Sequence, residues 1–169
     1  MSGTKRTTCM RRHRQLMTAK PPRQAKPLWQ CPICRRRFAN RNQSHACGRY
    51  HLKSHFEGKP FGVRQLYKLL VAQIRQSGPI TILPEKTRIA FQVRMSFAAI
   101  QVQSSRIVGH LVLAHRHERP CFHHINSISR HNHVHHFRLA TPQDLNRELC
   151  RFIESAYAVG QQKHLRNHP

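Results

Sequence analysis

Two segments of the chain carry apolar residues at the spacing of an amphipathic helix. The first ends near Ser77-Gly78-Pro79. The second begins at Thr141-Pro142-Gln143-Asp144, where threonine suits the N-cap and proline suits the first turn. The apolar positions are Val63, Leu66, Tyr67, Leu70 and Ile74 in the first segment, and Leu145, Leu149, Phe152, Ile153 and Ala156 in the second. We expect both apolar faces to pack into one core.

Between these segments the apolar pattern changes to a period of two, which predicts strands with one buried face. Apolar and polar residues alternate from Ile89 to Phe97, and the phase then slips, so we expect a bulge or break at Ala98-Ala99. Further strands are predicted at 107–113 and 134–139, whereas the polar stretch 116–130 is predicted to be a loop. The order helix, strands, helix predicts an α+β fold with an antiparallel sheet of three to five strands packed with helices.

Composition divides the chain into four predicted parts. Residues 1–27 combine basic residues with prolines and show no periodicity, so they are expected to form a disordered basic arm. A small zinc-knuckle-like Cys/His module is expected at 28–50, followed by the α+β domain at 51–160. Residues 161–169 are expected to be a frayed tail.

The chain is strongly basic. The 169 residues include 30 Lys and Arg but only 6 Asp and Glu, which gives a net charge of +24 with histidine neutral. Such a chain attracts polyanions through counterion release, so we expect non-specific association with nucleic acid through phosphate contacts. A high arginine content inherited from a GC-rich genome would give the same charge without a dedicated ligand. The expected phosphate-contacting residues are Arg35, Arg36, Arg37, Arg41 and Arg49.

The rest of the composition argues against several classes of function and several cellular compartments. Aromatic residues are 7% of the chain and do not interleave with the arginines, so a base-stacking surface is not expected. The scarcity of acidic residues argues against mechanisms built on paired carboxylates. The chain has no apolar run of about twenty residues and no signal-peptide core, and its six cysteines do not suit a disulfide scaffold. We expect a cytoplasmic protein with no membrane contact.

The stretch from Cys31 to Cys47 has the residue types and spacing of a metal site. Cys31 and Cys34 form a Cys-x-x-Cys turn that aims two thiolates at one ion, and a second pair about a dozen residues later closes a tetrahedron. That pair is His45 and Cys47 in one register, and Cys47 and His51 in another. So small a module buries too little surface to fold alone, so we expect bound Zn²⁺ to stabilise it. Four protein ligands leave no position for water, which makes the expected site structural.

A redox site is the alternative interpretation of the same cysteines, because Cys-Pro-x-Cys also occurs in thioredoxin-like proteins. There the motif lies between a strand and a helix, whereas here a proline-rich basic arm precedes it. The second Cys-His pair is also unexplained by redox chemistry. Unligated cysteines are the remaining alternative.

Short stretches spread over most of residues 27–160 match the pattern of a known family. They are Trp29 with Cys31-Pro-Ile-Cys34, residues 37–45, Cys47-Gly48-Arg49-Tyr50, Gly58-Lys59-Pro60, residues 87–95, residues 131–136 and Ser155-Ala156-Tyr157. On these stretches the chain resembles bacterial proteins that carry the domain of unknown function numbered 5655. The resemblance implies that Cys31, Cys34, His45 and Cys47 are the metal-type positions, and it implies no activity.

Histidines are concentrated near the end of the predicted sheet. Nine of the fifteen lie within residues 110–136. In a strand from 131 onward, His133 and His135 share a face with apolar residues, so we expect packed, hydrogen-bonded side chains there. The alternative is a ligand-binding or catalytic pocket at 131–136, which would make the protein a small enzyme.

Catalytic motifs are otherwise missing from the sequence, and no residue is assigned a catalytic role. Neither a Gly-x-Ser-x-Gly nor a Gly-rich phosphate loop nor His-Glu-x-x-His occurs. Cys121 and Cys150 have no evident partner and are predicted to be small buried side chains. The sequence therefore predicts a non-enzymatic, zinc-stabilised binding module, with a small enzyme or a protein-interaction adaptor as alternatives.

Overall fold

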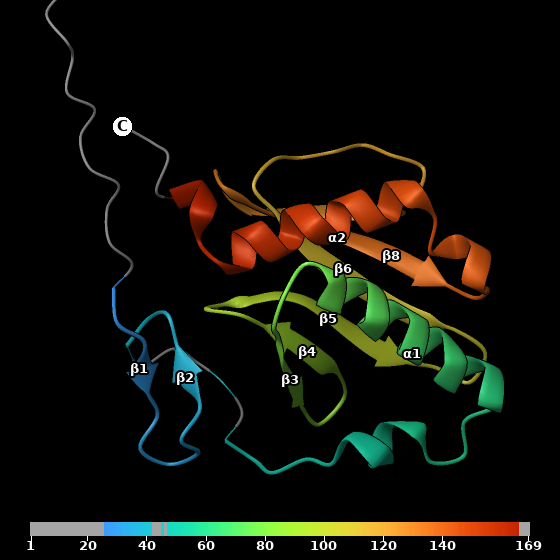
Figure 1. Cartoon of the computed structure of the whole chain (residues 1–169), viewed down its shortest axis with the longest axis horizontal. Helices are drawn as coiled ribbons and strands as arrows, with labels where there is room; N and C mark the ends of the chain where they lie inside the picture. Colours follow the sequence, from blue (N-terminus) through green and yellow to red (C-terminus); the bar gives the residue numbers. More distant parts are fainter. Residues whose placement is uncertain (1–25, 42–44, 46, 166–169) are drawn as a thin grey trace, which may run out of the picture.

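The computed structural model describes residues 26–41, 45 and 47–165 of the chain (Figure 1). The disordered basic arm expected at 1–27 lies outside the described residues except for its last two. Of the frayed tail expected at 161–169, residues 163–165 form a short 3-10 helix, η3 (Lys163–Leu165), and the last four lie outside the described residues. None of the described helices is long and apolar enough to cross a membrane.

The main sheet is antiparallel throughout and contains six strands. They are β3 (Thr81–Pro84), β4 (Ile89–Gln92), β5 (Ser96–Val102), β6 (Ile107–Leu113), β7 (His124–Ser129) and β8 (Asn132–Leu139), in the spatial order β3-β4-β5-β6-β8-β7. The α+β fold with an antiparallel sheet is confirmed, but the prediction of three to five strands is wrong. Both edge strands were missed. β3 has only four residues, and β7 lies within the stretch predicted to be a loop, because all but one of its residues are exposed.

The alternation from Ile89 to Phe97 belongs to two strands, which corrects the prediction of one. The chain reverses between β4 and β5, where the N–H of Val93 donates to the carbonyl of Met95 at 3.2 Å. Ala98-Ala99 themselves pair regularly with β6. Phe91 pairs with Ala98 and Gln92 with Ser96, so the register shift leaves Phe97 as an extra residue on β5, directly before the predicted position. The slip in phase therefore marks this irregularity, and the hairpin turn comes before it.

Two helices cover one face of the sheet, α1 (Phe61–Gln76) and α2 (Arg147–Gly160). α2 begins later than predicted, because the residues from Thr141 form a capping box on a short 3-10 helix, η2 (Pro142–Asp144). The side chain of Asn146 then caps α2 by accepting the N–H of Leu149 at 2.9 Å. Both predicted helices are confirmed, with that change of start.

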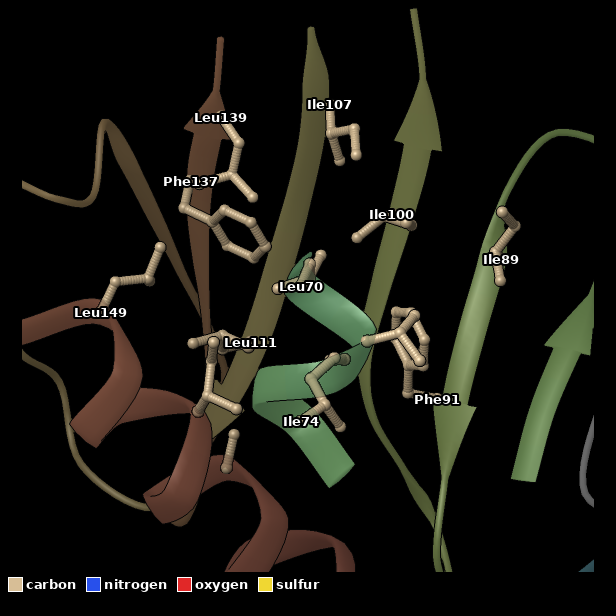
Figure 2. Packing of buried hydrophobic residues seen from close by; sticks show 14 of the residues in the cluster. Leu70, Ile74, Ile89, Phe91, Ile100, Ile107, Leu111, Phe137, Leu139 and Leu149 are labelled. Atoms are coloured by element: carbon tan, nitrogen blue, oxygen red, sulfur yellow. The ribbon is translucent and has the colours of Figure 1, made fainter. Parts of the chain in front are cut away.

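The core lies between the two helices and the sheet, as the apolar spacing predicted. Figure 2 shows Leu70 and Ile74 of α1 and Leu149 of α2 reaching toward Ile100 and Phe137 on the sheet. All five side chains are at most 1% exposed. Burial on this scale is worth about 1.5–3 kcal/mol for each large apolar side chain, so the helix–sheet domain does not depend on a metal for its core.

A second, two-stranded sheet lies outside this core. It consists of β1 (Trp29–Gln30) and β2 (Arg37–Phe38), and the 3-10 helix η1 (Leu52–Phe56) leads from it toward α1 (Figure 1). We call residues 28–50 the knuckle. The side-chain amide of Gln92 donates to the carbonyl of Arg37 at 2.6 Å, and Arg94 donates to the carbonyl of Lys26. The first contact holds the knuckle against β4, and the second ties Lys26, just before the knuckle, to the turn between β4 and β5.

Candidate metal centre

A tight turn between β1 and β2 positions the first two cysteines. The N–H of Arg35 donates to the carbonyl of Cys31, and the N–H of Cys31 donates to the carbonyl of Arg36, both at 2.9 Å. Arg35 adopts a left-handed conformation with φ of +61°. This conformation closes the turn and brings the side chains of Cys31 and Cys34 to the same side.

Four side chains converge on one point at this turn. The ligand atoms of Cys31, Cys34, His45 and Cys47 all lie within 4.8 Å of one another. The Nε2 atom of His45 is 3.2 Å from the Sγ atoms of both Cys34 and Cys47, and the Sγ atoms of Cys31 and Cys47 are 3.9 Å apart. No other such group occurs within residues 26–41, 45 and 47–165.

The sulfur–sulfur distance matches that around a tetrahedral zinc ion, and the sulfur–nitrogen distances are somewhat shorter. With Zn–S bonds of about 2.3 Å and Zn–N bonds of about 2.0–2.1 Å, ideal tetrahedral geometry places two sulfurs about 3.8 Å apart and a sulfur and a nitrogen about 3.6 Å apart. The knuckle contains no Asp or Glu, so the donors are three soft sulfurs and one imidazole. This donor set favours zinc over magnesium or calcium, which prefer oxygen ligands. The cluster can therefore hold a metal ion, and its chemistry is consistent with zinc.

Aromatic packing orients the histidine of the cluster. The ring of His45 lies on that of Phe38, with centroids 4.1 Å apart, and Trp29 approaches its edge at 6.3 Å. Phe38 is buried at 5% exposure. The three rings form a small apolar support that directs Nε2 toward the sulfurs. Sequence reasoning missed the role of Trp29, for which the signal was an aromatic residue two positions before the first cysteine.

The protonation of the thiols shows why a cation suits the cluster. Hydrogen bonds from the backbone N–H groups of Cys34 and Ile33 lower the pKa of Cys31 to about 6. Burial and the neighbouring thiols of Cys31 and Cys34 raise the pKa of Cys47 to about 11. The thiols of Cys31 and Cys47 thus favour different protonation states when no positive charge lies between them. A coordinated divalent cation supplies that charge and deprotonates its thiol ligands.

The structure distinguishes between the two registers considered from the sequence. His45 lies with the three cysteines, whereas His51 is exposed at the start of η1 and is not part of the group. Spacing alone left this choice open. The structure brings together the same four residues to which the family resemblance points.

The five arginines expected to contact phosphate are all in or beside the knuckle. Arg35, Arg37, Arg41 and Arg49 are exposed, and Arg36 is half-buried with its guanidinium donating to the carbonyl of Gly48 at 3.1 Å. A crease of about 340 Å³ separates the knuckle from β3 and β4, and Arg35, Arg36 and Arg37 line it. The structure does not bring Arg41 and Arg49 into that crease.

The histidines of β8 are held inside the domain or at its margin. His135 is fully buried, and its Nε2 accepts the N–H of His117 at 2.9 Å while its Nδ1 lies 3.1 Å from the carbonyl of His133. His133 is half-buried with Nδ1 2.8 Å from the hydroxyl of Ser127. Both ring nitrogens of His135 are occupied, which supports the packed, hydrogen-bonded interpretation of these two residues.

The two remaining described cysteines lie outside the cluster and are half-buried, where the sequence predicted buried side chains. Burial, followed by the proximity of Glu148, raises the pKa of Cys121 to about 11. Burial also raises the pKa of Cys150. Both thiols are therefore protonated and unreactive near neutral pH.

Comparison with known protein families gives a match to the helix–sheet domain. The family described as Domain of unknown function (DUF5655) matches residues 52–160, from η1 through the whole sheet to the end of α2. The chain belongs to this family. The DUF5655 match begins after the last cysteine of the cluster, so the knuckle precedes the matched region. The searches of curated proteins and of solved structures find no match.

The left-handed turn in this DUF5655 protein gives a first prediction. Arg35→Gly is expected to tighten metal binding about fivefold, because glycine removes roughly 1 kcal/mol of left-handed strain. Competition with a chelator for zinc measures the change. Arg37→Gly is the matched control, since it removes the same charge from β2, where φ is not positive. An equal effect of both substitutions would assign the gain to charge and contradict the role given to the turn.

Proposed function

We propose that the Cys3His cluster holds a structural Zn²⁺ and that the protein is a non-enzymatic, zinc-stabilised binding module that associates with nucleic acid. The observation that carries the zinc assignment is the convergence of four ligand atoms within 4.8 Å. Cys31, Cys34, His45 and Cys47 are the proposed ligands. Zinc bound there joins the β1–β2 turn to the segment that carries His45 and Cys47, and this supplies the stability that the small knuckle lacks.

The structural assignment of the zinc follows from the number of donors. A tetrahedral ion surrounded by three sulfurs and one nitrogen has no position for water or substrate. Catalytic zinc sites keep such a position. The cluster therefore supports a role in folding and not in hydrolysis.

The placement of the basic residues supports the nucleic-acid part of the proposal. Four of the five knuckle arginines are exposed, and the knuckle has no acidic residue to neutralise them. Phosphate contacts from such residues give affinity without reading sequence. We also propose a cytoplasmic location, because metal-bound thiolates persist in a reducing compartment.

Binding of a short DNA duplex at increasing salt tests this proposal. The logarithm of the affinity is expected to fall linearly with the logarithm of the salt concentration, with a slope of about −0.9 per phosphate contacted. Replacing Arg37, Arg41 and Arg49 with glutamine is expected to reduce the magnitude of that slope by about 2.7. Fluorescence anisotropy of a labelled duplex measures both quantities.

The control is Arg147→Gln, which removes one charge from the exposed start of α2, away from the knuckle. It is expected to change the slope less than any single knuckle substitution. An affinity that does not depend on salt would refute nucleic-acid association through phosphate contacts. An equal loss from Arg147→Gln would refute the assignment of those contacts to the knuckle.

A further inference from the structure

The face of the sheet that points away from the helices carries a line of histidines. Side chains alternate between the faces of a strand, so the neighbours of the core residues Ile100, Leu111 and Phe137 point to the opposite side. Strand register aligns these neighbours in one row across β5, β6, β8 and β7. The row consists of Ala99, His110, His136 and His124.

A hollow of about 530 Å³ lies over Ala99, His110 and His136 of this row. The small side chain of Ala99 leaves space at one end, and arginines and histidines surround that space. The basic residues in its lining are Arg88, Arg106, Arg138, His110, His123 and His136. No acidic residue is among the described residues that line it. Three arginine side chains therefore line the hollow, which makes its lining basic even with all its histidines neutral.

The three arginines come from separate parts of the domain and differ in how they are held. Arg88 lies before β4 and pairs with Glu85 at 2.6 Å, which fixes its position at the rim. Arg106 lies before β6 and donates from Nε to the side chain of Gln103 at 2.8 Å. Arg138 on β8 is exposed, and within the part of the chain that the structure describes it has no ion pair. Arg106 and Arg138 thus have charges that no carboxylate compensates.

The histidines contribute hydrogen-bonding groups and not charge. Burial, followed by the proximity of His136 and Arg88, lowers the pKa of His110 to about 4. Burial and the neighbouring His124 lower the pKa of His136. The Nε2 atom of His136 is buried and has no hydrogen-bond partner among the described residues. A buried polar atom without a partner costs free energy, which a ligand in the hollow would recover.

We propose that this hollow binds the phosphate group of a small phosphorylated ligand. Arg106 and Arg138 would contact the phosphate oxygens, and neutral His110 and His136 would donate N–H groups to it. The volume of the hollow lies within the range of about 300–1,000 Å³ found for small-molecule sites. The proposal does not depend on the metal cluster or on the nucleic-acid proposal, because none of these residues belongs to the knuckle.

Sequence reasoning did not find this group of residues. It noted the concentration of histidines at 110–136 but considered a pocket only within 131–136. The hollow arises because β6 pairs with β8, which places His110 beside His136 with ring centroids 5.7 Å apart. Strand order across the sheet, which the local pattern does not encode, is what creates the hollow.

Titration of the full-length, ¹⁵N-labelled protein with inorganic pyrophosphate at constant ionic strength tests the proposal. The ring-nitrogen resonances of His110 and His136 are expected to shift and to saturate together. Arg138→Gln and Arg106→Gln are each expected to weaken binding about tenfold, since each removes a charge-assisted hydrogen bond. Both side chains are exposed, so neither variant removes core packing. If one variant does not fold, the other still tests the proposal.

Two comparisons separate this site from general attraction to a basic protein. Arg147→Gln removes an equal charge elsewhere and is expected to leave pyrophosphate affinity unchanged. A short DNA duplex is expected to bind without shifting His110 and His136. Equal weakening by all three variants, or no saturable shift at these histidines, would overturn the proposal. Displacement of pyrophosphate by the duplex would assign the hollow to a nucleic-acid surface and would likewise overturn it.

Discussion

Cys47→Ser is expected to unfold the knuckle and to leave the helix–sheet domain folded. The sulfur of Cys47 lies 3.2 Å from Nε2 of His45 and 3.9 Å from the sulfur of Cys31, so its loss removes one of the two donors, with His45, that join their segment to the β1–β2 turn. The contribution at stake is large, because structural zinc supplies apparent binding energies of about 10–16 kcal/mol in isolated zinc-finger peptides. The domain keeps its own core between α1, α2 and the sheet.

The chain offers a direct readout of this change. Trp29 is the only tryptophan, and its ring lies 6.0 Å from that of Phe38 inside the knuckle. Tryptophan emission therefore reports on the knuckle, while far-ultraviolet circular dichroism reports on α1 and α2. In Cys47→Ser, and in wild-type protein treated with a chelator, we expect red-shifted emission with a helical signal that is nearly unchanged.

Cys150→Ser is the matched control. Cys150 is half-buried on α2, outside the cluster, and its thiol approaches the carbonyl of Leu145 at 3.8 Å. We expect its tryptophan emission to equal that of the wild type. If the emission of Cys47→Ser equalled that of the wild type, and if the chelator left the emission of the wild type unchanged, the knuckle would fold without a metal. That result would contradict its proposed stabilisation.

Acid is expected to destabilise the helix–sheet domain by about 3 kcal/mol or more between pH 7 and pH 4. The pKa of His110 is about 4 in the folded domain and 6.5 in an unfolded chain. Between these values the unfolded state binds more protons, so the free energy of unfolding falls as the pH falls. A difference of about 2.5 pKa units corresponds to about 3 kcal/mol. Burial also lowers the pKa values of His135 and His136, which act in the same direction.

Urea unfolding at several pH values, followed by the helical signal, measures this effect. His110→Gln is expected to flatten the dependence of stability on pH, whatever its effect on stability at pH 7. His115→Gln, which replaces an exposed histidine after β6, is expected to preserve the wild-type slope. Stability that rose on acidification, or a slope unchanged in His110→Gln, would contradict the neutral state of the half-buried His110.

The parts of the fold that sequence predicted well are those in which one face is buried along the whole element. β6 was placed at the residues that form it, because Ile107, Leu111 and Leu113 are buried in alternation with less buried positions. β7 was missed because its side chains are nearly all exposed and its pairing with β8 is what makes it a strand. The β4–β5 hairpin was missed because alternation continued through Val93 and Met95, which form the turn.

The candidate metal site also could not be predicted in full from the local sequence pattern. Spacing identified Cys31, Cys34 and Cys47 but could not choose between His45 and His51, because both distances suit a tetrahedral ion. The choice depends on packing, since the ring of His45 lies on Phe38 whereas His51 is exposed. The hollow over the sheet depends on contacts still more distant in sequence, between β5, β6 and β8. Local sequence patterns therefore gave no signal for it.

Zinc analysis of full-length protein purified without an affinity tag, combined with X-ray absorption at the zinc edge, tests the central claim most directly. We predict one zinc per chain, coordinated by three sulfurs at about 2.3 Å and one nitrogen at about 2.0–2.1 Å. Protein that is folded in the knuckle but lacks stoichiometric zinc would contradict the claim. A coordination shell without sulfur would contradict it equally, because the ion would then lie away from Cys31, Cys34 and Cys47.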